Sequence, residues 1–177
     1  MVTSVTWLPS MLPNASSAMT AAALERISSA ASELRLGNLN LRSGDASTVT
    51  IERGNLVMNG CELSAGFGAA ISIGSRSECE VTNCRVTAGR YGLVVEDATG
   101  VIDACEFANL TEDGVIARIG ASPTLRNTTI TRCGLRGIYI YQSAKPTIEG
   151  CDIAQTGGPG IAVAAQSAPA IVRCRIR

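Results

Sequence analysis

The sequence contains no histidine and has few aromatic residues, which make up 3% of its 177 residues. Histidine is the commonest general base in enzymes and the commonest metal ligand, so its absence removes the usual means of acid–base catalysis and metal binding. We therefore expect no metal ion and no other cofactor. The scarcity of aromatic rings leaves the interior to be filled by aliphatic residues, alanine and cysteine.

An excess of one charge and long apolar runs are also missing. Lys+Arg and Asp+Glu are 15 each, so the basic stripe that a nucleic-acid or anionic-membrane binder needs is absent. The chain has no run of about 18 apolar residues, as a membrane-spanning helix requires. A secretory signal would require a basic residue near the N-terminus, and none precedes Arg26. We expect neither nucleic acid nor a membrane as partner, and a cytoplasmic, reducing location.

What the sequence does contain is an internal repeat. Residues 128–150 and 151–173 share an aliphatic residue at the third place, Gly-Ile at the tenth and eleventh, and Pro-x-Ile near the end. A Cys-x-apolar motif recurs at nearly constant spacing, at Cys61, Cys84, Cys105, Cys151 and Cys174, with Thr128 in the missing place and Leu39 starting a degenerate first copy. Self-similarity at a fixed short period is typical of solenoids.

Each copy contains two further apolar segments that alternate with polar residues. One is a pair such as Leu93/Val95 or Ile138/Ile140, and the other centres on a single residue such as Ile102 or Ile148. Alternation with period two indicates strands, and the intervening glycines and prolines indicate bends. One copy cannot bury its apolar face alone, so the copies must stack. We predict an all-β parallel solenoid over residues 34–177, with three strands in each of about six turns.

Two stretches carry a resemblance to a known family, SPTLRNTTITRCGLRGIYI from residue 122 and KPTIEGCDIAQTGGPGIAV from residue 145. They resemble the repeats of right-handed parallel β-helices in the pectate-lyase-like superfamily, and the resemblance extends over residues 34–177. It implies that the solenoid is right-handed. It also implies that an N-terminal amphipathic helix covers the first turn.

The segment 1–33 lacks the repeat and suits that capping role. Residues 1–15, with Trp7, are expected to form an irregular lead-in. Residues 17–33 are rich in alanine and place apolar residues at four-residue spacing after a serine N-cap, which predicts an amphipathic helix. We therefore divide the chain into a lead-in with capping helix (1–33) and a parallel β-helix (34–177). The sequence stops inside a strand, so we expect either a continuation of the natural protein or a partner at this end.

The five repeated cysteines are expected to form an internal column of thiols about 4.8 Å apart, the spacing of neighbouring strands. One thiol per turn does not supply the converging ligands of a zinc site. Thr128 in the same position favours a packing role, since free cysteine behaves as a small hydrophobic residue. Cys79 and Cys133 lie outside the column, and we expect Cys133 to be the most exposed thiol.

Outward positions give columns of charge that alternate in sign from turn to turn. One column reads Glu62, Arg85, Glu106, Thr129, Asp152, Arg175, and another reads Thr82, Asp103, Arg126, Glu149, Val172. We interpret both as ion pairs between neighbouring turns on a solvated face. The resemblance implies that a lyase groove would need several acids together and an unpaired base. The alternation instead separates the acids and places each of them beside a base.

The sequence contains no strong catalytic candidate. The weak candidates are Tyr91, Asp113 and Arg136, which alignment of the copies places one above another in the bend before the second strand of the turn. Together they would present a polar site to a ligand across three turns. The simpler interpretation is that Arg90 pairs with Glu112, and Asp113 with Arg136.

The outward side of the second strand predicts a largely uncharged stripe, made of Val94, Ile116, Tyr139, Tyr141, Ala162 and Ala164. Contiguous apolar surface marks an interaction site unless another segment covers it, and the lead-in with Trp7 is a candidate for such cover. We expect a protein partner or self-association, through this face or through the open C-terminal end.

Two functions follow from these observations. The favoured hypothesis is a non-catalytic scaffold or interaction module, either part of a larger bacterial protein or a self-associating assembly. The alternative, which the resemblance alone implies, is a carbohydrate-active enzyme, namely a polysaccharide lyase, hydrolase or epimerase. Short turns of nearly equal length, without insertions, leave little chain to build a cleft, so the sequence favours the module over the enzyme.

Overall fold

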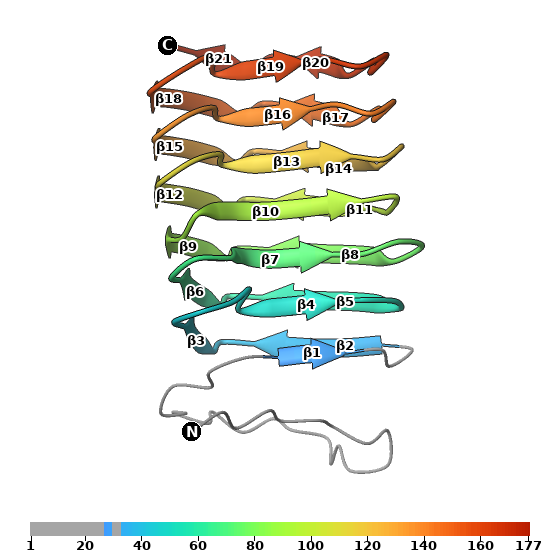
Figure 1. The fold of residues 1–177 in the computed structure, drawn as a ribbon, viewed down its shortest axis with the longest axis vertical. Helices are drawn as coiled ribbons and strands as arrows, with labels where there is room; N and C mark the ends of the chain where they lie inside the picture. The colour runs from blue at the N-terminus through green and yellow to red at the C-terminus, as the bar shows by residue number, and fades with distance from the viewer. Residues whose placement is uncertain (1–26, 30–32) are drawn as a thin grey trace.

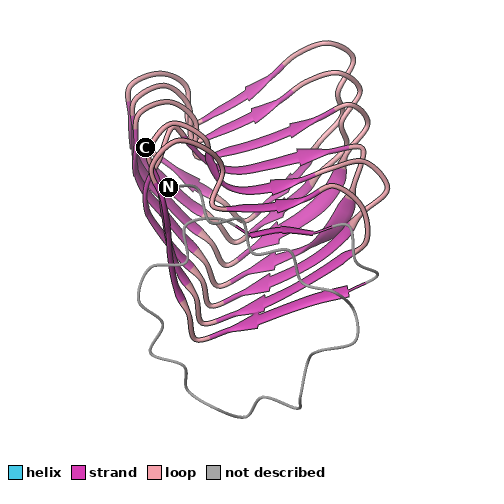
Figure 2. Cartoon of the chain, turned by 60° about the horizontal axis from the view of Figure 1, so that its bottom comes forward, coloured by secondary structure: helices cyan, strands magenta, loops and turns pink. Residues whose placement is uncertain are grey.

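The computed structural model describes residues 27–29 and 33–177, and the regular structure in this part of the chain consists of β-strands. The strands stack in three parallel sheets around a common axis, which makes a solenoid (Figure 1). We call the three sheets A, B and C. Each complete coil contributes one strand to each of them, first to sheet C, then to sheet B and then to sheet A, with bends between the strands (Figure 2). The predicted all-β solenoid with three strands per turn is confirmed.

The three sheets have the following members. Sheet A contains β1 (Ile27–Ser29), β4 (Val49–Ile51), β7 (Ala69–Ile73), β10 (Tyr91–Glu96), β13 (Val115–Arg118), β16 (Ile138–Ile140) and β19 (Ile161–Val163). Sheet B contains β3 (Asn40–Ser43), β6 (Glu62–Ala65), β9 (Arg85–Ala88), β12 (Glu106–Leu110), β15 (Thr129–Cys133), β18 (Asp152–Thr156) and β21 (Arg175–Ile176). Sheet C contains β2 (Glu33–Gly37), β5 (Asn55–Asn59), β8 (Glu78–Thr82), β11 (Thr99–Asp103), β14 (Ser122–Arg126), β17 (Thr147–Glu149) and β20 (Ala170–Val172). We number the coils 1 to 6, from β2–β4 to β17–β19.

The strands of each sheet pair in register, so equivalent residues of successive coils lie side by side. In sheet A, Leu93 pairs with Val115, and Val115 in turn pairs with Ile138. In sheet B, Glu106 lies between Arg85 and Thr129. The sequence repeat and the physical repeat therefore coincide. The charge columns predicted from the sequence are present as ion pairs between neighbouring coils, among them Arg85–Glu106 and Arg126–Asp103.

The interior is one continuous apolar cluster that runs through all the coils. Alternate strand residues point into it, and Leu93, Ile102 and Ile130 are fully buried. Phe107 is the largest side chain among the fully buried residues and the aromatic ring of this cluster. The expectation that aliphatic residues and cysteine fill the interior is confirmed for the described residues.

The shared Gly-Ile of the repeat has a packing cause. A Cβ atom on Gly114 would meet the side chain of Ile130 and the carbonyl oxygen of Gly137, and one on Gly137 would meet Ile153 and Gly160 in the same way. Only glycine lets the chain enter sheet A this close to the coil above it. The glycine is therefore required by the geometry of the coil.

The bend between sheets C and B also repeats. The residue before the cysteine of each motif, or before its equivalents Leu39 and Thr128, adopts a left-handed conformation, with φ between 50° and 63°, at Asn38, Gly60, Asn83, Ala104, Asn127, Gly150 and Arg173. Glycine and asparagine accept this conformation most readily, and they fill five of the seven places. The bend is thus encoded by residue type, immediately before the Cys-x-apolar motif.

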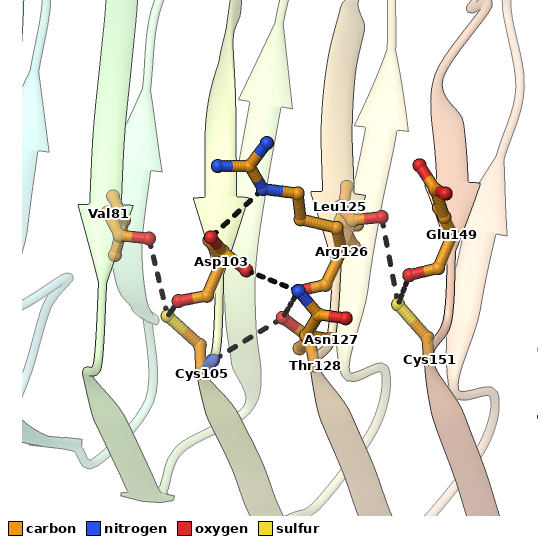
Figure 3. A network of polar contacts seen from close by, with 9 residues as sticks. All are labelled: Val81, Asp103, Cys105, Leu125, Arg126, Asn127, Thr128, Glu149 and Cys151. Carbon is orange, nitrogen blue, oxygen red and sulfur yellow. Dashed lines mark hydrogen bonds and ion pairs between the residues drawn. The ribbon is translucent and has the colours of Figure 1, made fainter.

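The cysteine of the motif caps this bend with its thiol (Figure 3). Cys105 Sγ donates a hydrogen bond to Asp103 O at 3.3 Å, and Cys151 Sγ donates to Glu149 O at 3.5 Å. In the coil between them, Thr128 Oγ1 makes the same contact with Arg126 O at 2.9 Å. A small side chain with a donor satisfies the position, which explains why threonine can replace cysteine there.

The predicted capping helix over 17–33 is wrong where the structure describes it. Ile27–Ser29 is strand β1, and it pairs with β4 through Ile27↔Val49. The reason is that sheet A offers an unpaired edge, whose hydrogen bonds outweigh the helix propensity of an alanine-rich segment. The spacing from Ile27 to Val49 equals that from Val49 to Ile71, so the segment already matched the repeat. The rest of the predicted helix and the lead-in with Trp7 lie outside the described residues.

Candidate interaction surface

The predicted stripe lies on the outer face of sheet A, where β10, β13 and β16 are neighbours (Figure 1). Register places Val94 beside Ile116 and Ile116 beside Tyr139. A second apolar cluster, separate from the interior, forms here from Ala69, Tyr91, Val94, Ile116, Tyr139 and Tyr141. We call these six residues the tyrosine patch. Val94 and Ile116 point outward and yet are only 8% and 5% exposed, since the tyrosines pack against them.

The tyrosines of the patch are held in place by arginines. The rings of Tyr139 and Tyr141 stack with their centroids 4.4 Å apart. The guanidinium of Arg136 lies over the Tyr139 ring, 3.7 Å from its centroid, and Arg118 Nη1 donates a hydrogen bond to the Tyr141 hydroxyl at 2.8 Å. Cation–π and hydrogen-bond contacts of this kind fix a large ring at a surface. The patch is therefore an ordered, preformed surface.

Two of the three weak catalytic candidates form an ion pair. Asp113 is 1% exposed and accepts three hydrogen bonds from Arg136, at 2.8 Å from Nε, 3.0 Å from Nη2 and 3.1 Å from the backbone nitrogen. The bond with Asp113 raises the pKa of the Arg136 guanidinium further above its usual value. A base that loses a proton with such difficulty is unsuited to abstract one from a substrate. The pair is suited to hold the bend before β13 and the ring of Tyr139.

The third candidate, Tyr91, joins a different pair. Its hydroxyl donates to Glu112 Oε2 at 2.7 Å, while Arg90 Nε donates to Glu112 Oε1 at 2.7 Å. Burial, followed by the bond to Glu112, raises the pKa of Tyr91. The Tyr91 bond, followed by the Arg90 pair, lowers the pKa of Glu112. Tyr91 thus contacts Glu112, so the structure does not join the three candidates into one triad.

The remaining stripe residues contribute less than predicted. Ala162 lies in β19 beside Tyr139, and Ala164 is exposed beyond the end of that strand. Neither belongs to the tyrosine patch. Sequence reasoning missed Arg118 and its ion pair with Glu96, which lie at the other edge of sheet A. The two residues are register partners in successive coils, so the repeat contained the signal.

The expectation that Cys133 is the most exposed thiol is wrong. Cys133 is buried at the end of β15, and burial raises the pKa of its thiol to about 11. Arg132 adopts a left-handed conformation with φ 54°, which bends the strand and turns the next side chain inward. Among the described cysteines, Cys174 in the last coil is the least buried.

Other kinds of site are not apparent in the described part of the chain. No group of three or more acidic or cysteine side chains there could hold a metal ion, and no described helix is long and apolar enough to cross a membrane. A depression of about 770 Å³ lies along sheet B and reaches β21, lined by residues that include Thr129, Thr131, Asp152 and Ile176. None of Tyr91, Asp113 and Arg136 lines it.

The comparison with protein families decides the classification. The sequence model of a family described as "right handed beta helix region" matches residues 69–177, which is 109 of the 177 residues. The chain belongs to the right-handed β-helix family. The match starts at β7, so it contains every residue of the tyrosine patch. No curated protein and no solved structure matches the chain.

Proposed function

We propose that this right-handed β-helix is a non-catalytic scaffold whose tyrosine patch binds a protein. The observation that carries the proposal is the combination of Val94 and Ile116, aliphatic and outward-pointing, with half-buried tyrosines on an otherwise solvated sheet. Tyrosine and arginine are the residues that most often dominate binding energy in protein interfaces. An ordered patch also loses little conformational entropy when a partner docks.

The paired state of the polar residues supports the absence of catalysis. Arg136 is bound to Asp113, and Tyr91 to Glu112, so each candidate acid or base is already engaged inside the molecule. Free thiols and balanced charge support a reducing, cytoplasmic location. Membership of a larger bacterial protein, and association through the C-terminal end, stay predictions.

The proposal is tested with acidic polysaccharides and Ca²⁺, by following the ultraviolet absorbance of unsaturated product and the release of reducing ends. We expect no turnover. Turnover that disappears in Arg136→Ala, with the fold retained by circular dichroism, would contradict the proposal. Arg126→Ala, which removes an ion pair on sheet C, is the matched control.

The alternative is a carbohydrate-active enzyme, a lyase, hydrolase or epimerase, and one observation favours it. Asp152 lines the depression together with Thr129 and Thr131. Its Oδ1 is buried without a hydrogen-bond partner, while its Oδ2 pairs with Arg177. Activity lost in Asp152→Ala and kept in Asp103→Ala would support this alternative. Inactivity of the unaltered protein on neutral and acidic glycans would remove it.

A further inference from the structure

The two edges of sheet A carry a checkerboard of charge around the tyrosine patch. At the edge where the strands start, Arg90 of coil 3 pairs with Glu112 of coil 4. At the edge where they end, the order is reversed, with Glu96 in coil 3 and Arg118 in coil 4. Coil 3 therefore reads positive to negative across the sheet, and coil 4 reads negative to positive. These two coils also carry Val94 and Ile116.

The four charged side chains of the checkerboard are partly exposed and can make further contacts. The Arg90 and Glu112 side chains are 49% and 29% exposed, and those of Arg118 and Glu96 are 37% and 29% exposed. Each group thus contacts its neighbour in the molecule and stays partly accessible to solvent. The edges are about 20 Å apart, since a strand rises about 3.3 Å per residue. The neighbouring coil 2 has Gly68 and Gly74 at the equivalent edge positions, which are uncharged.

We propose that the partner of the tyrosine patch is a second copy of this chain, docked face to face about a two-fold axis parallel to the solenoid. This inference rests on the proposed function and names its partner. Such an axis places each coil opposite the same coil of the other copy, with the strands antiparallel. Arg90 then faces Glu96 of the second copy, and Glu112 faces Arg118 of the second copy. Both contacts occur twice, and all four are attractive.

The apolar residues fix the direction of the axis. With the axis parallel to the solenoid, the half-buried Tyr139 ring lies opposite Tyr139 of the second copy. The positions of Val94 and Ile116, which the tyrosines largely cover, also lie opposite the same positions of the second copy. An axis across the solenoid also matches the charges, but it inverts the column and places Tyr139 opposite Ser72. Burial of apolar side chains against each other is favourable, whereas an aromatic ring against a serine is less so. The parallel axis is the arrangement in which charge and apolarity agree.

The size of the face sets the expected strength. Coils 1 to 6 contribute six strands to this face, about 4.8 Å apart, and the face is about 20 Å wide. Its area is therefore at the lower end of the range for specific interfaces. We therefore expect a reversible dimer that depends on concentration. It should weaken as salt rises, because the edge charges are partly exposed.

The test reverses the charges of one edge at a time, so that the ion pair at that edge inside the molecule keeps opposite signs. The start-edge variant is Arg90→Glu/Glu112→Arg, and the end-edge variant is Glu96→Arg/Arg118→Glu. In each variant alone, all four contacts between copies become repulsive, and the dissociation constant measured by sedimentation velocity should rise at least about tenfold. An equimolar mixture of the two should associate as tightly as the unaltered protein, because the reversed edges complement each other.

The control variant is Arg85→Glu/Glu106→Arg, which reverses an equivalent ion pair on sheet B and should leave the dissociation constant unchanged. Urea unfolding of every variant separates lost association from lost folding. The proposal is overturned by an unaltered protein that stays monomeric, by single-edge variants that associate as before, or by a mixture that does not recover. Those outcomes leave a scaffold with another partner intact, whereas polysaccharide turnover would contradict the scaffold without affecting the association result.

Discussion

On sheet B the outward residues at the start of the strands are charged, with Arg85 beside Glu106 in register, whereas on sheet A the central outward positions hold Val94 and Ile116. Both faces are built by the same repeat around the same interior. The inward residues of both sheets are mostly aliphatic, so the fold does not require the outward residues to differ. A solvated sheet tolerates charge at low cost, while an apolar outward column needs a reason.

The difference teaches where information about function lies in a solenoid. Inward positions and bend residues determine that the coils stack, and each coil repeats them. Outward positions are free to vary, and on sheet A they combine apolar residues with arginine–acid pairs that differ from edge to edge. The surface that departs from the repeat is therefore the surface on which to test function.

Breaking the interior that both faces share should have the largest effect. Phe107→Ala removes the largest fully buried side chain and leaves a cavity, which costs about 3–5 kcal/mol of unfolding free energy. Urea denaturation followed by circular dichroism measures the loss. Glu106→Ala, the outward neighbour on β12, should stay within about 0.5 kcal/mol of the unaltered protein. Similar losses in both variants would contradict a close-packed interior that is distinct from the surface.

The second largest effect should be the difference in unfolding free energy between an ion pair of sheet A and one of sheet B. Asp113 is buried and Arg136 is partly exposed, so Asp113→Ala leaves an arginine with limited access to water. We expect a loss of about 2 kcal/mol, below the value for a fully buried pair because solvent screens Arg136. Glu106→Ala, which breaks the more exposed pair on sheet B, should again cost no more than about 0.5 kcal/mol. Equal losses, measured in the same denaturation experiment, would show that the two faces use their charges alike.

The cysteine position gives a smaller and more specific effect. Cys105→Ala removes the donor that caps the bend at Asp103 O, which should cost about 1 kcal/mol. Cys105→Thr keeps a donor of the kind that Thr128 supplies in the next coil, and it should be closer to the unaltered protein. Thermal unfolding of both variants measures the difference. A more stable Cys105→Ala would mean that the thiol acts by volume alone.

Most of the fold could be predicted because the same pattern of apolar and polar residues recurs in every coil. The strand positions over residues 34–177 follow from residues such as Leu93, Ile102 and Cys105, whose equivalents recur in each turn. The strand at Ile27–Ser29 was not predicted, because this single weak copy of the repeat lies in an alanine-rich segment. Helix propensity gives the stronger local signal there. A sheet edge supplied by residues 49–51 is a tertiary effect that a local pattern does not show.

The candidate surface could be predicted in part. Alternation gave the outward direction of Val94, Ile116 and Tyr139, and the repeat predicted the Asp113–Arg136 pair. The bond from Tyr91 to Glu112 was not predictable, because register fixes which residues are neighbours but not how far a long side chain reaches. The inward turn of Cys133 depends on a left-handed residue, Arg132, whose type gives no hint of that conformation.

The smallest effect concerns the pH dependence of the start edge of sheet A. The pKa of Glu112 is lowered from its ordinary 4.5, first by the Tyr91 hydrogen bond and then by Arg90. A lowered carboxyl pKa stabilises the fold above pH 4.5, and this contribution is lost as pH falls through the folded-state value. The pKa of Tyr91 is raised from 10.0, so its contribution is present below pH 10.0 and is lost as pH rises through the higher folded-state value.

Carbon-detected NMR titration of the carboxyl groups checks this pair of shifts. Tyr91→Phe should move the pKa of Glu112 up toward its ordinary value, because the principal cause of the shift is gone. Asp103 lies on sheet C, and its pKa is lowered first by the hydrogen bond from Asn127. This pKa should not change and serves as the internal control. If the pKa of Glu112 stays where it is in Tyr91→Phe, Arg90 alone holds the carboxylate. The tyrosine would then be a packing residue of the patch, with no electrostatic part in the start edge of sheet A.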